Sequence, residues 1–188
     1  MKRLTDVILI TLFLPLLIPI FILVAILVGY KLGFPVFFKQ TRPGLKGELF
    51  EMIKFRSMTS DVDENCRHLP DEVRLTLFGK FLRSTSLDEL PGLLNVLKGD
   101  MSIVGPRPEQ SIFAKRFAET IPYYGFRHTV RPGITGWAQV KLGYTADENQ
   151  TRLKLEYDFF YIKYLSLWLE IIILVRTIGT VILGKGAR

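Results

Sequence analysis

The strongest constraint in this sequence is an uncharged apolar run near the N-terminus, "VILITLFLPLLIPIFILVAILVGY", which covers Val7 to Tyr30. A straight helix over this run would be about 36 Å long, which is enough to cross the hydrocarbon core of a bilayer. The run is longer than the apolar part of a signal peptide, and no small-residue cleavage motif follows it. It therefore predicts a membrane-anchoring helix.

Two features of this run bear on how it sits in the membrane. Pro15 and Pro19 lie near its middle, and each removes a backbone N–H from a helical hydrogen bond. Basic residues flank both ends, and such residues favour the cytoplasmic side. These are Lys2, Arg3, Lys31, Lys39, Arg42 and Lys46. The residues alone leave two alternatives: a helix that bends at the prolines and returns to the same face, and a single span with a proline kink.

Length and charge narrow the class of protein. A chain of 188 residues suits one domain, or one domain with an anchor. The net charge of +7 suits an anionic membrane surface, nucleic acid or phosphorylated substrates. Nucleic acid is disfavoured because the basic residues share a chain with two membrane-seeking segments. The single cysteine excludes an internal disulfide and fits a reducing compartment.

Residues 36–57 are typical of a β-hairpin, because aromatic and aliphatic runs flank a turn pair, Pro43-Gly44. In the second run Lys54 and Arg56 share one face with Phe50 and Met52. Taken alone, these two cations favour a solvated strand end.

Other patterns predict helices and loops. Helices are expected at 76–83, 109–120, 147–163 and 165–183, and another with Leu87, Leu90, Leu94 and Leu97 on one stripe, ending at Gly99. Residues 59–74 are expected to form a surface loop with one helical turn, and 130–140 a loop that places Arg131 and Trp137. In the last helix Glu170 and Arg176 disfavour a span and favour an interfacial or core helix. His68 and His128 lack partners at metal-ligand spacing.

An acidic pair, Asp88 and Glu89, lies at the start of the leucine-striped helix. Ser86 and Glu89 match a capping box, although Pro91 moves the start of the helix toward Asp88 or Leu90. The helix dipole favours the ionised carboxylates there. An ionised aspartate can act as a nucleophile, and its neighbour can hold Mg²⁺. Considered alone, the pair is better explained as a helix cap.

Cationic residues nearby favour a functional site over a helix cap. Arg107 lies in "GPRP", where two prolines and a glycine stiffen the backbone, and a rigid guanidinium binds phosphate well. Four other cations could converge on the same place: Lys54, Arg56, Arg83 and Arg131. An acidic pair, a metal and several arginines indicate phosphoryl transfer, which depends on positioning and charge neutralisation. The sequence contains no Walker, kinase or G-x-G-x-x-G motif.

Five segments together identify a family. They are "FFKQTRPG", "KFRSM", "RSTSLDELPGLLNVLKGDMSIVGPRP", "VRPGITGWAQV" and "YDFFYIKYLSLWLE". They cover nearly the whole chain, and their order resembles that of the monotopic phosphoglycosyl transferases, also called bacterial sugar transferases. The long central segment is highly specific.

The resemblance implies an activity. Such enzymes move a phosphosugar from a UDP-sugar to a polyprenol phosphate, such as undecaprenyl phosphate, and release UMP in the first membrane step of bacterial glycan or exopolysaccharide assembly. By match to the family's acidic dyad, Asp88 would be the nucleophile of a ping-pong mechanism through a phosphosugar-aspartyl intermediate. Glu89, with Asp88, would hold Mg²⁺. Arg83 and Arg107, and more weakly Lys54 and Arg131, would bind substrate phosphates.

The resemblance also implies an α+β, mostly helical fold. Residues 1–32 would form a re-entrant membrane helix that breaks at Pro19. Residues 33–188 would form a catalytic domain on the cytoplasmic face of the bacterial inner membrane, with a small β-hairpin and amphipathic, interfacial C-terminal helices. The family often has Ser-Pro at the break, whereas this chain has Ile18-Pro19. The chain looks like a minimal member or a catalytic part of a longer protein, and its C-terminal half hints at a hexose substrate.

Two other classes of function fit some of the same residues. A membrane-bound, Mg²⁺-dependent phosphohydrolase would use the same acidic pair and pass the phosphosugar to water. A non-enzymatic basic protein on the membrane surface would bind acidic partners, but it leaves the rigid "GPRP" segment unexplained.

Overall fold

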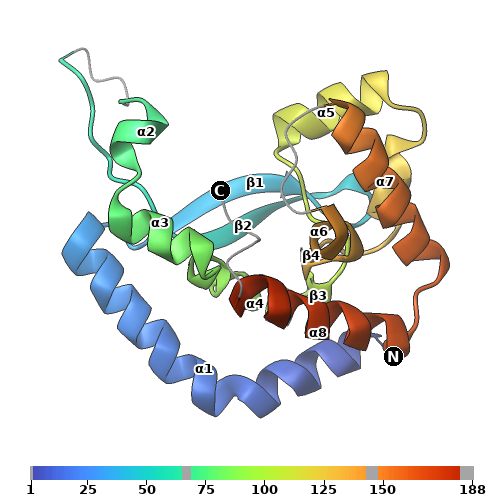
Figure 1. Cartoon of the computed structure of the whole chain (residues 1–188), viewed down its shortest axis with the longest axis horizontal. Coiled ribbons are helices and arrows are strands. Elements are labelled where there is room, and N and C mark those ends of the chain that lie inside the picture. The colour runs from blue at the N-terminus through green and yellow to red at the C-terminus, as the bar shows by residue number, and fades with distance from the viewer. Residues whose placement is uncertain (1, 65–68, 143–147, 183–188) are drawn as a thin grey trace.

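The N-terminal apolar run folds into one long helix, α1 (Lys2–Leu32), which continues through Pro15 and Pro19. The structure, a computed structural model, describes residues 2–64, 69–142 and 148–182. Figure 1 shows α1 bent along the lower edge of the molecule, as expected where prolines remove helical hydrogen bonds. Among the described residues, α1 alone is long and apolar enough to cross a membrane.

Both ends of α1 pack against the rest of the molecule. Near its C-terminal end, Val24, Val28 and Leu32 are buried with Phe55 and Leu82 in one apolar cluster. Near its N-terminal end, Ile10 is buried in a second cluster, and its buried partners are Met52, Val96 and Met101. The middle of the helix instead exposes large apolar side chains, namely Leu12, Phe13, Leu16 and Ile18.

A β-hairpin crosses the molecule above α1 (Figure 1). Strands β1 (Phe37–Pro43) and β2 (Leu49–Phe55) pair antiparallel, from Phe37 opposite Phe55 to Pro43 opposite Leu49. The hairpin predicted at 36–57 is therefore confirmed. Its turn lies slightly later than Pro43-Gly44, in a 3₁₀ turn over Leu45–Gly47.

The segment after the hairpin forms several short helices. The predicted turn within 59–74 is α2 (Asp71–Arg74), while His68 lies outside the described residues. The helix predicted at 76–83 is α3 (Leu77–Ser84). In Figure 1, α2 and α3 lie at the left, beside one end of the hairpin.

The leucine-striped helix predicted after α3 is present, but it starts later than Leu87 and Leu90. The chain forms a 3₁₀ turn over Leu87–Glu89 and then α4 (Gly92–Lys98), because Pro91 has no N–H to continue one helix through. Leu94 and Leu97 are exposed on α4, whereas Val96 is buried. The helix ends at Gly99, as predicted, with a left-handed φ of 105°.

The loop predicted at 130–140 is wrong. It contains β4 (Gly133–Thr135), which pairs in parallel with β3 (Ser102–Val104), and it enters α6 (Trp137–Leu142). A Cβ on Gly133 would lie 2.1 Å from the backbone N of Gly105. The glycines of this segment therefore serve close backbone packing beside a two-residue strand contact, which sequence periodicity does not reveal.

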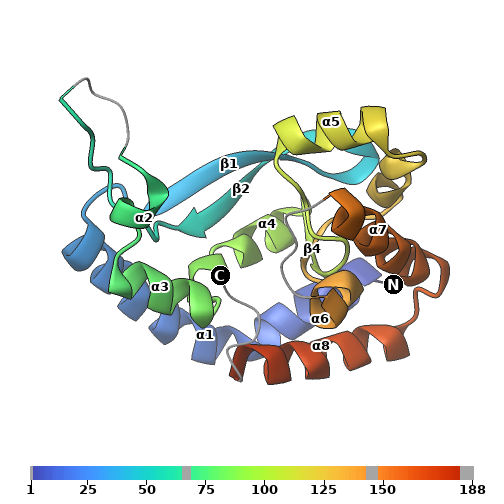
Figure 2. The same ribbon diagram turned by 45° about the horizontal axis from the view of Figure 1, so that its top comes forward.

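The remaining helices match their predicted ranges. They are α5 (Ser111–Thr120), α7 (Glu148–Lys163) and α8 (Leu167–Ile182), with a 3₁₀ segment over Tyr124–Thr129. Helix α8 buries Leu169, Glu170 and Ile173 and exposes an apolar face. That face includes Leu167, Trp168, Ile171, Val175 and Ile178. Figures 1 and 2 both show α8 in the lower part of the molecule near the N-terminal half of α1, with α5 on the opposite side of the body.

Candidate active site

A pocket of about 790 Å³ opens beside the hairpin. Its walls come from β1, β2, the 58–60 segment, α2, α3, the 3₁₀ turn over Leu87–Glu89, and residues 107–113. The pocket brings together six residues predicted from the sequence to share a site, namely Lys54, Arg56, Arg83, Asp88, Glu89 and Arg107. The expectation of a solvated strand end is wrong for Lys54, whose side chain is 19% exposed and paired with Glu89.

Asp88 is the unpaired carboxylate of this site. Its residue is only 7% exposed, yet it lines the pocket. No hydrogen bond or ion pair to Asp88 occurs within residues 2–64, 69–142 and 148–182. Burial raises the pKa of Asp88 to about 6, with the positive charge of Lys54 acting in the opposite direction. The side chain is thus mostly ionised at neutral pH, with its oxygens available to a ligand.

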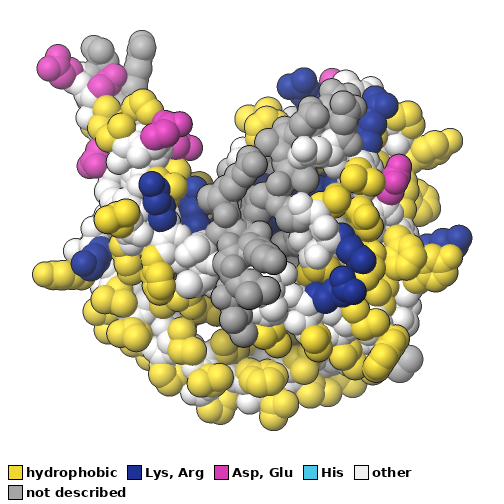
Figure 3. Space-filling model, in the orientation of Figure 1, with side chains coloured by type: hydrophobic (Ala, Val, Ile, Leu, Met, Phe, Trp, Pro, Cys, Tyr) yellow, Lys and Arg dark blue, Asp and Glu magenta, His cyan; other side chains and the backbone are white. Residues whose placement is uncertain are grey.

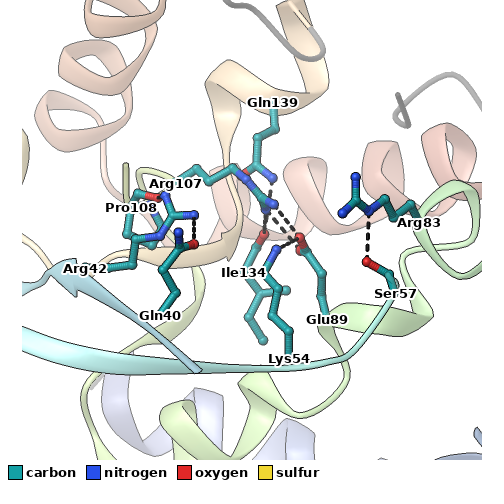
Figure 4. A network of polar contacts seen from close by, with 10 residues as sticks. All are labelled: Gln40, Arg42, Lys54, Ser57, Arg83, Glu89, Arg107, Pro108, Ile134 and Gln139. Carbon is teal, nitrogen blue, oxygen red and sulfur yellow. Dashed lines mark hydrogen bonds and ion pairs between the residues drawn. The ribbon is translucent and has the colours of Figure 1, made fainter. Parts of the chain in front are cut away.

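Glu89 is held by two cations (Figure 4). Lys54 Nζ donates to Glu89 Oε1 at 2.7 Å, and Arg107 Nη1 donates to Oε2 at 3.0 Å. A second nitrogen of Arg107 also contacts Glu89. Burial alone would raise the pKa of Glu89, but the charges and hydrogen bonds of Arg107 and Lys54 outweigh it and hold the pKa well below its usual value. Glu89 therefore remains a carboxylate that fixes the two cations at the pocket wall.

Arg83 presents unused donors to the pocket. Its Nε donates to Ser57 Oγ at 2.9 Å (Figure 4), which fixes the plane of the guanidinium. Its two terminal nitrogens have no hydrogen bond or ion pair within the described part of the chain. Both are suited to bind a phosphate oxygen beside Asp88.

Arg131 lies outside the residues that line the pocket. Its Nε donates to the carbonyl of Gly99 at 2.8 Å, so the guanidinium is bound to the end of α4. The predicted role of Arg131 in substrate binding receives no support from this position. Arg42 and Arg74 do line the pocket, although sequence reasoning did not place them there. The segment "TRPG", which contains Arg42, was the one available signal.

Two details of the predicted acidic pair need correction. The capping box is wrong, because Ser86 makes no side-chain capping bond and adopts a left-handed φ of 56°. The expected shift of Asp88 toward ionisation is also wrong, since burial raises its pKa. Helix α4 begins after Pro91, so Asp88 and Glu89 lie in the preceding 3₁₀ turn, which directs them into the protein.

The acidic pair is a limited metal site on its own. No group of three or more His, Cys, Asp or Glu side chains suited to a metal occurs among the described residues. Mg²⁺ is usually bound by one or two carboxylates together with substrate phosphates and water. Asp88 and Glu89 both line the pocket, so they could supply the one or two carboxylates that such a Mg²⁺ site needs.

The pocket thus combines a buried, unpaired carboxylate with fixed cations, on a body attached to an apolar helix. The bacterial sugar transferase family model matches residues 1–184. The chain belongs to this family, as its sequence segments predicted.

The chain is similar to several relatives. It is 49% identical over 82% of its length to a UDP-N-acetylgalactosamine-undecaprenyl-phosphate N-acetylgalactosaminephosphotransferase of Aeromonas hydrophila. It is 40% identical over 100% of its length to a UDP-glucose:undecaprenyl-phosphate glucose-1-phosphate transferase of Escherichia coli strain K12. It is 47% identical over 82% of its length to an uncharacterized sugar transferase, EpsL, of Bacillus subtilis. The matches cover 37%, 41% and 73% of these relatives, respectively.

Proposed function

We propose that this chain transfers a phosphosugar from a UDP-sugar to a polyprenol phosphate such as undecaprenyl phosphate, and releases UMP. The observation that carries the proposal is the unpaired carboxylate of Asp88 in a pocket whose other walls carry Arg83, Arg107 and Lys54. A nucleophile needs this freedom, and a diphosphate needs these cations. Two of the relatives bear names that describe the same type of transfer.

The reaction proceeds in two displacements. An Asp88 oxygen attacks the phosphorus that bears the sugar, the bond from this phosphorus to the bridging oxygen breaks, and UMP leaves with that oxygen. A phosphate oxygen of the polyprenol phosphate then attacks the same phosphorus. This second step forms the polyprenol-diphosphate sugar and returns the Asp88 carboxylate, which gives ping-pong kinetics.

The neighbouring side chains act on charge and position. Arg83 and Arg107 bind phosphate oxygens through directional N–H groups, and Lys54 adds a buried positive charge. Glu89 keeps Lys54 and Arg107 on the wall where the diphosphate lies. Asp88 and Glu89 would hold Mg²⁺, which would supply positive charge to offset that of the phosphates and of the departing UMP.

The same proposal places α1 as a re-entrant helix, bent near Pro19, with both ends on the cytoplasmic face of the inner membrane. Both ends of α1 pack on the same body: Asp6 accepts a hydrogen bond of 2.7 Å from Ser102 Oγ at one end, and Val28 is fully buried at the other. A helix that crossed the bilayer would separate these two contacts. Hydrophobic side chains cover the lower edge of the molecule, where α1 lies (Figure 3), and the exposed face of α8 suits the interface.

Release of UMP tests the transferase. The purified protein in a lipid bilayer receives Mg²⁺, undecaprenyl phosphate and a panel of UDP-sugars that includes UDP-N-acetylgalactosamine and UDP-glucose. We expect UMP from a subset of these sugars, steady release that requires the lipid acceptor, and an added phosphosugar mass on the protein when the acceptor is omitted. Steady release without the acceptor would indicate a phosphohydrolase. No release from any sugar, with no mass added, would reject the transferase.

Labelling tests the topology separately. In a Cys66→Ser background, Leu4→Cys reports the start of α1 and Leu49→Cys reports the hairpin, since both leucines are exposed. We expect a membrane-impermeant thiol reagent to label both variants in inside-out vesicles and neither in right-side-out vesicles. Labelling of the two variants in opposite vesicles would show a spanning helix.

A further inference from the structure

The loop that carries Arg107 is held through its carbonyl groups. Pro106 and Pro108 have no backbone N–H, so carbonyl oxygens are the main groups through which the loop can be fixed. Each of three consecutive carbonyls accepts a hydrogen bond from outside the loop. The donors are Gly133 N to Pro106 O (3.0 Å), Arg127 Nη2 to Arg107 O (2.8 Å) and Arg42 Nη1 to Pro108 O (2.9 Å).

Arg127, the middle donor, is a buried side chain. Its guanidinium is 2% exposed and lies 2.8 Å from Asp158, which is equally buried. A second nitrogen donates to Tyr124 Oη at 2.9 Å and lies 3.9 Å from Glu109. One planar group thus joins α7, the 3₁₀ segment over Tyr124–Thr129 and the loop of the active site.

We propose that Arg127 is a positioning residue that sets the direction of the Arg107 side chain toward Glu89 and the substrate phosphate. This inference rests on the proposed function, in which Arg107 binds that phosphate. Arg127 touches the backbone of Arg107 and is absent from the residues that line the pocket. Arg127 also lies 3.9 Å from Glu109, which lines the pocket but is paired with Lys154, so the direct contact of Arg127 with the substrate-binding groups is the one to Arg107.

Stability alone is a poor explanation for this arrangement. A buried ion pair commonly adds little over well-packed apolar side chains, because both charges lose their hydration. The guanidinium supplies something that an apolar side chain lacks, namely several N–H donors in a fixed plane. Those donors bind Arg107 O and Tyr124 Oη together while the charge lies beside Asp158, which a lysine ammonium at the end of a flexible chain cannot reproduce.

The test uses Arg127→Lys, which keeps a positive charge beside Asp158. We expect kcat/KM for the UDP-sugar, measured by UMP release, to fall by about 10- to 100-fold, since small errors in the position of a binding group have effects of this size. In an Arg107→Ala background the same substitution should change kcat/KM by less than about twofold. The matched control is Tyr124→Phe, which removes another hydrogen bond of Arg127 but leaves the loop carbonyl bound; it should retain kcat/KM within about twofold.

The opposite results would overturn the inference. If Arg127→Lys and Arg107→Ala reduce kcat/KM independently, so that their factors multiply, Arg127 does not act through Arg107. A lower unfolding temperature with unchanged kcat/KM would show a purely structural role. If the unaltered protein releases no UMP, the transferase proposal fails by itself. The positioning role is then judged by calorimetric binding of inorganic pyrophosphate, which Arg127→Lys should weaken except in the Arg107→Ala background; equal binding would reject it.

Discussion

Two buried clusters of charge adjoin the "GPRP" loop, and each contains two acids and two cations. In the first, Lys54 and Arg107 both bind Glu89, which leaves Asp88 unpaired. In the second, each acid has a cation of its own: Asp158 pairs with Arg127, and Glu109 with Lys154. The first cluster lines the pocket through all four residues, whereas the second reaches the pocket only at Glu109.

This difference shows that burial of charge does not by itself mark a reactive group. Asp88 and Asp158 are both buried, at 7% and 2% exposed, yet only Asp88 faces a pocket without a bound cation. The uneven sharing of cations in the first cluster leaves Glu89 paired with two cations and Asp88 with none. Substitution of matched residues in the two clusters should therefore give opposite effects.

Asp88→Asn should have the largest effect on function. We expect UMP release to fall by at least about 1,000-fold, because an amide cannot form the covalent intermediate. Stability should move the other way. Since the folded pKa lies above the unfolded value, the acid contributes stability below about pH 4 that is lost as pH rises through about 6. At pH 7.5 the variant should unfold with a free energy raised by up to about 2 kcal/mol, as measured by chemical denaturation. Residual lipid-dependent transfer near the original rate would exclude Asp88 as the nucleophile.

Asp158→Asn should lower the free energy of unfolding, in contrast to Asp88→Asn. It leaves the buried charge of Arg127 without its carboxylate partner, which typically costs about 3 kcal/mol. The same denaturation experiment measures the loss. Arg127→Met combined with Asp158→Leu is the control, because removal of both charges should recover much of that stability. Equal stability of Asp158→Asn and the unaltered protein would mean that the second cluster is not a tightly coupled pair.

The pH dependence of the reaction distinguishes the two carboxylates of the first cluster. With the pKa of Asp88 at about 6, kcat/KM for the UDP-sugar should rise about tenfold per pH unit below 6 and become level above about 7. The ionised form is the nucleophile, so activity is lost as acid is added. Glu89 should contribute no step in this range, because Arg107 and Lys54 hold its pKa below the usual value. A profile that is flat from pH 5 to 8 would contradict the burial of a free Asp88.

Most residues of the first cluster could be predicted from the sequence, whereas the second cluster could not. The acidic pair, the rigid arginine and the hairpin cations are close to recognisable segments, and the structure brings Lys54, Arg83, Asp88, Glu89 and Arg107 into one pocket. The long apolar helix, the hairpin and the main amphipathic helices follow from hydrophobic patterns that a single segment contains.

The remaining features depend on contacts between distant segments. Arg127 and Asp158 lie 31 positions apart, and neither has a neighbour whose type or spacing indicates an ion pair. Strands β3 and β4 are three residues long and pair at two positions, which is too short for an alternating pattern. The position of Arg131 was misjudged for the same reason: its own segment contains no sign that Gly99 would accept its hydrogen bond.

The smallest predicted effect concerns an ion pair outside both clusters. Lys39 Nζ and Glu51 Oε2 form a diagonal ion pair across the hairpin at 3.1 Å, with side chains 57% and 63% exposed. Because water screens exposed charges, Lys39→Met should change the free energy of unfolding by no more than about 0.5 kcal/mol. The denaturation experiment used for Asp158→Asn measures this change on the same scale. A loss as large as that of Asp158→Asn would show that the hairpin pair is far less solvated than its exposure indicates, and burial could then no longer explain the difference between these pairs.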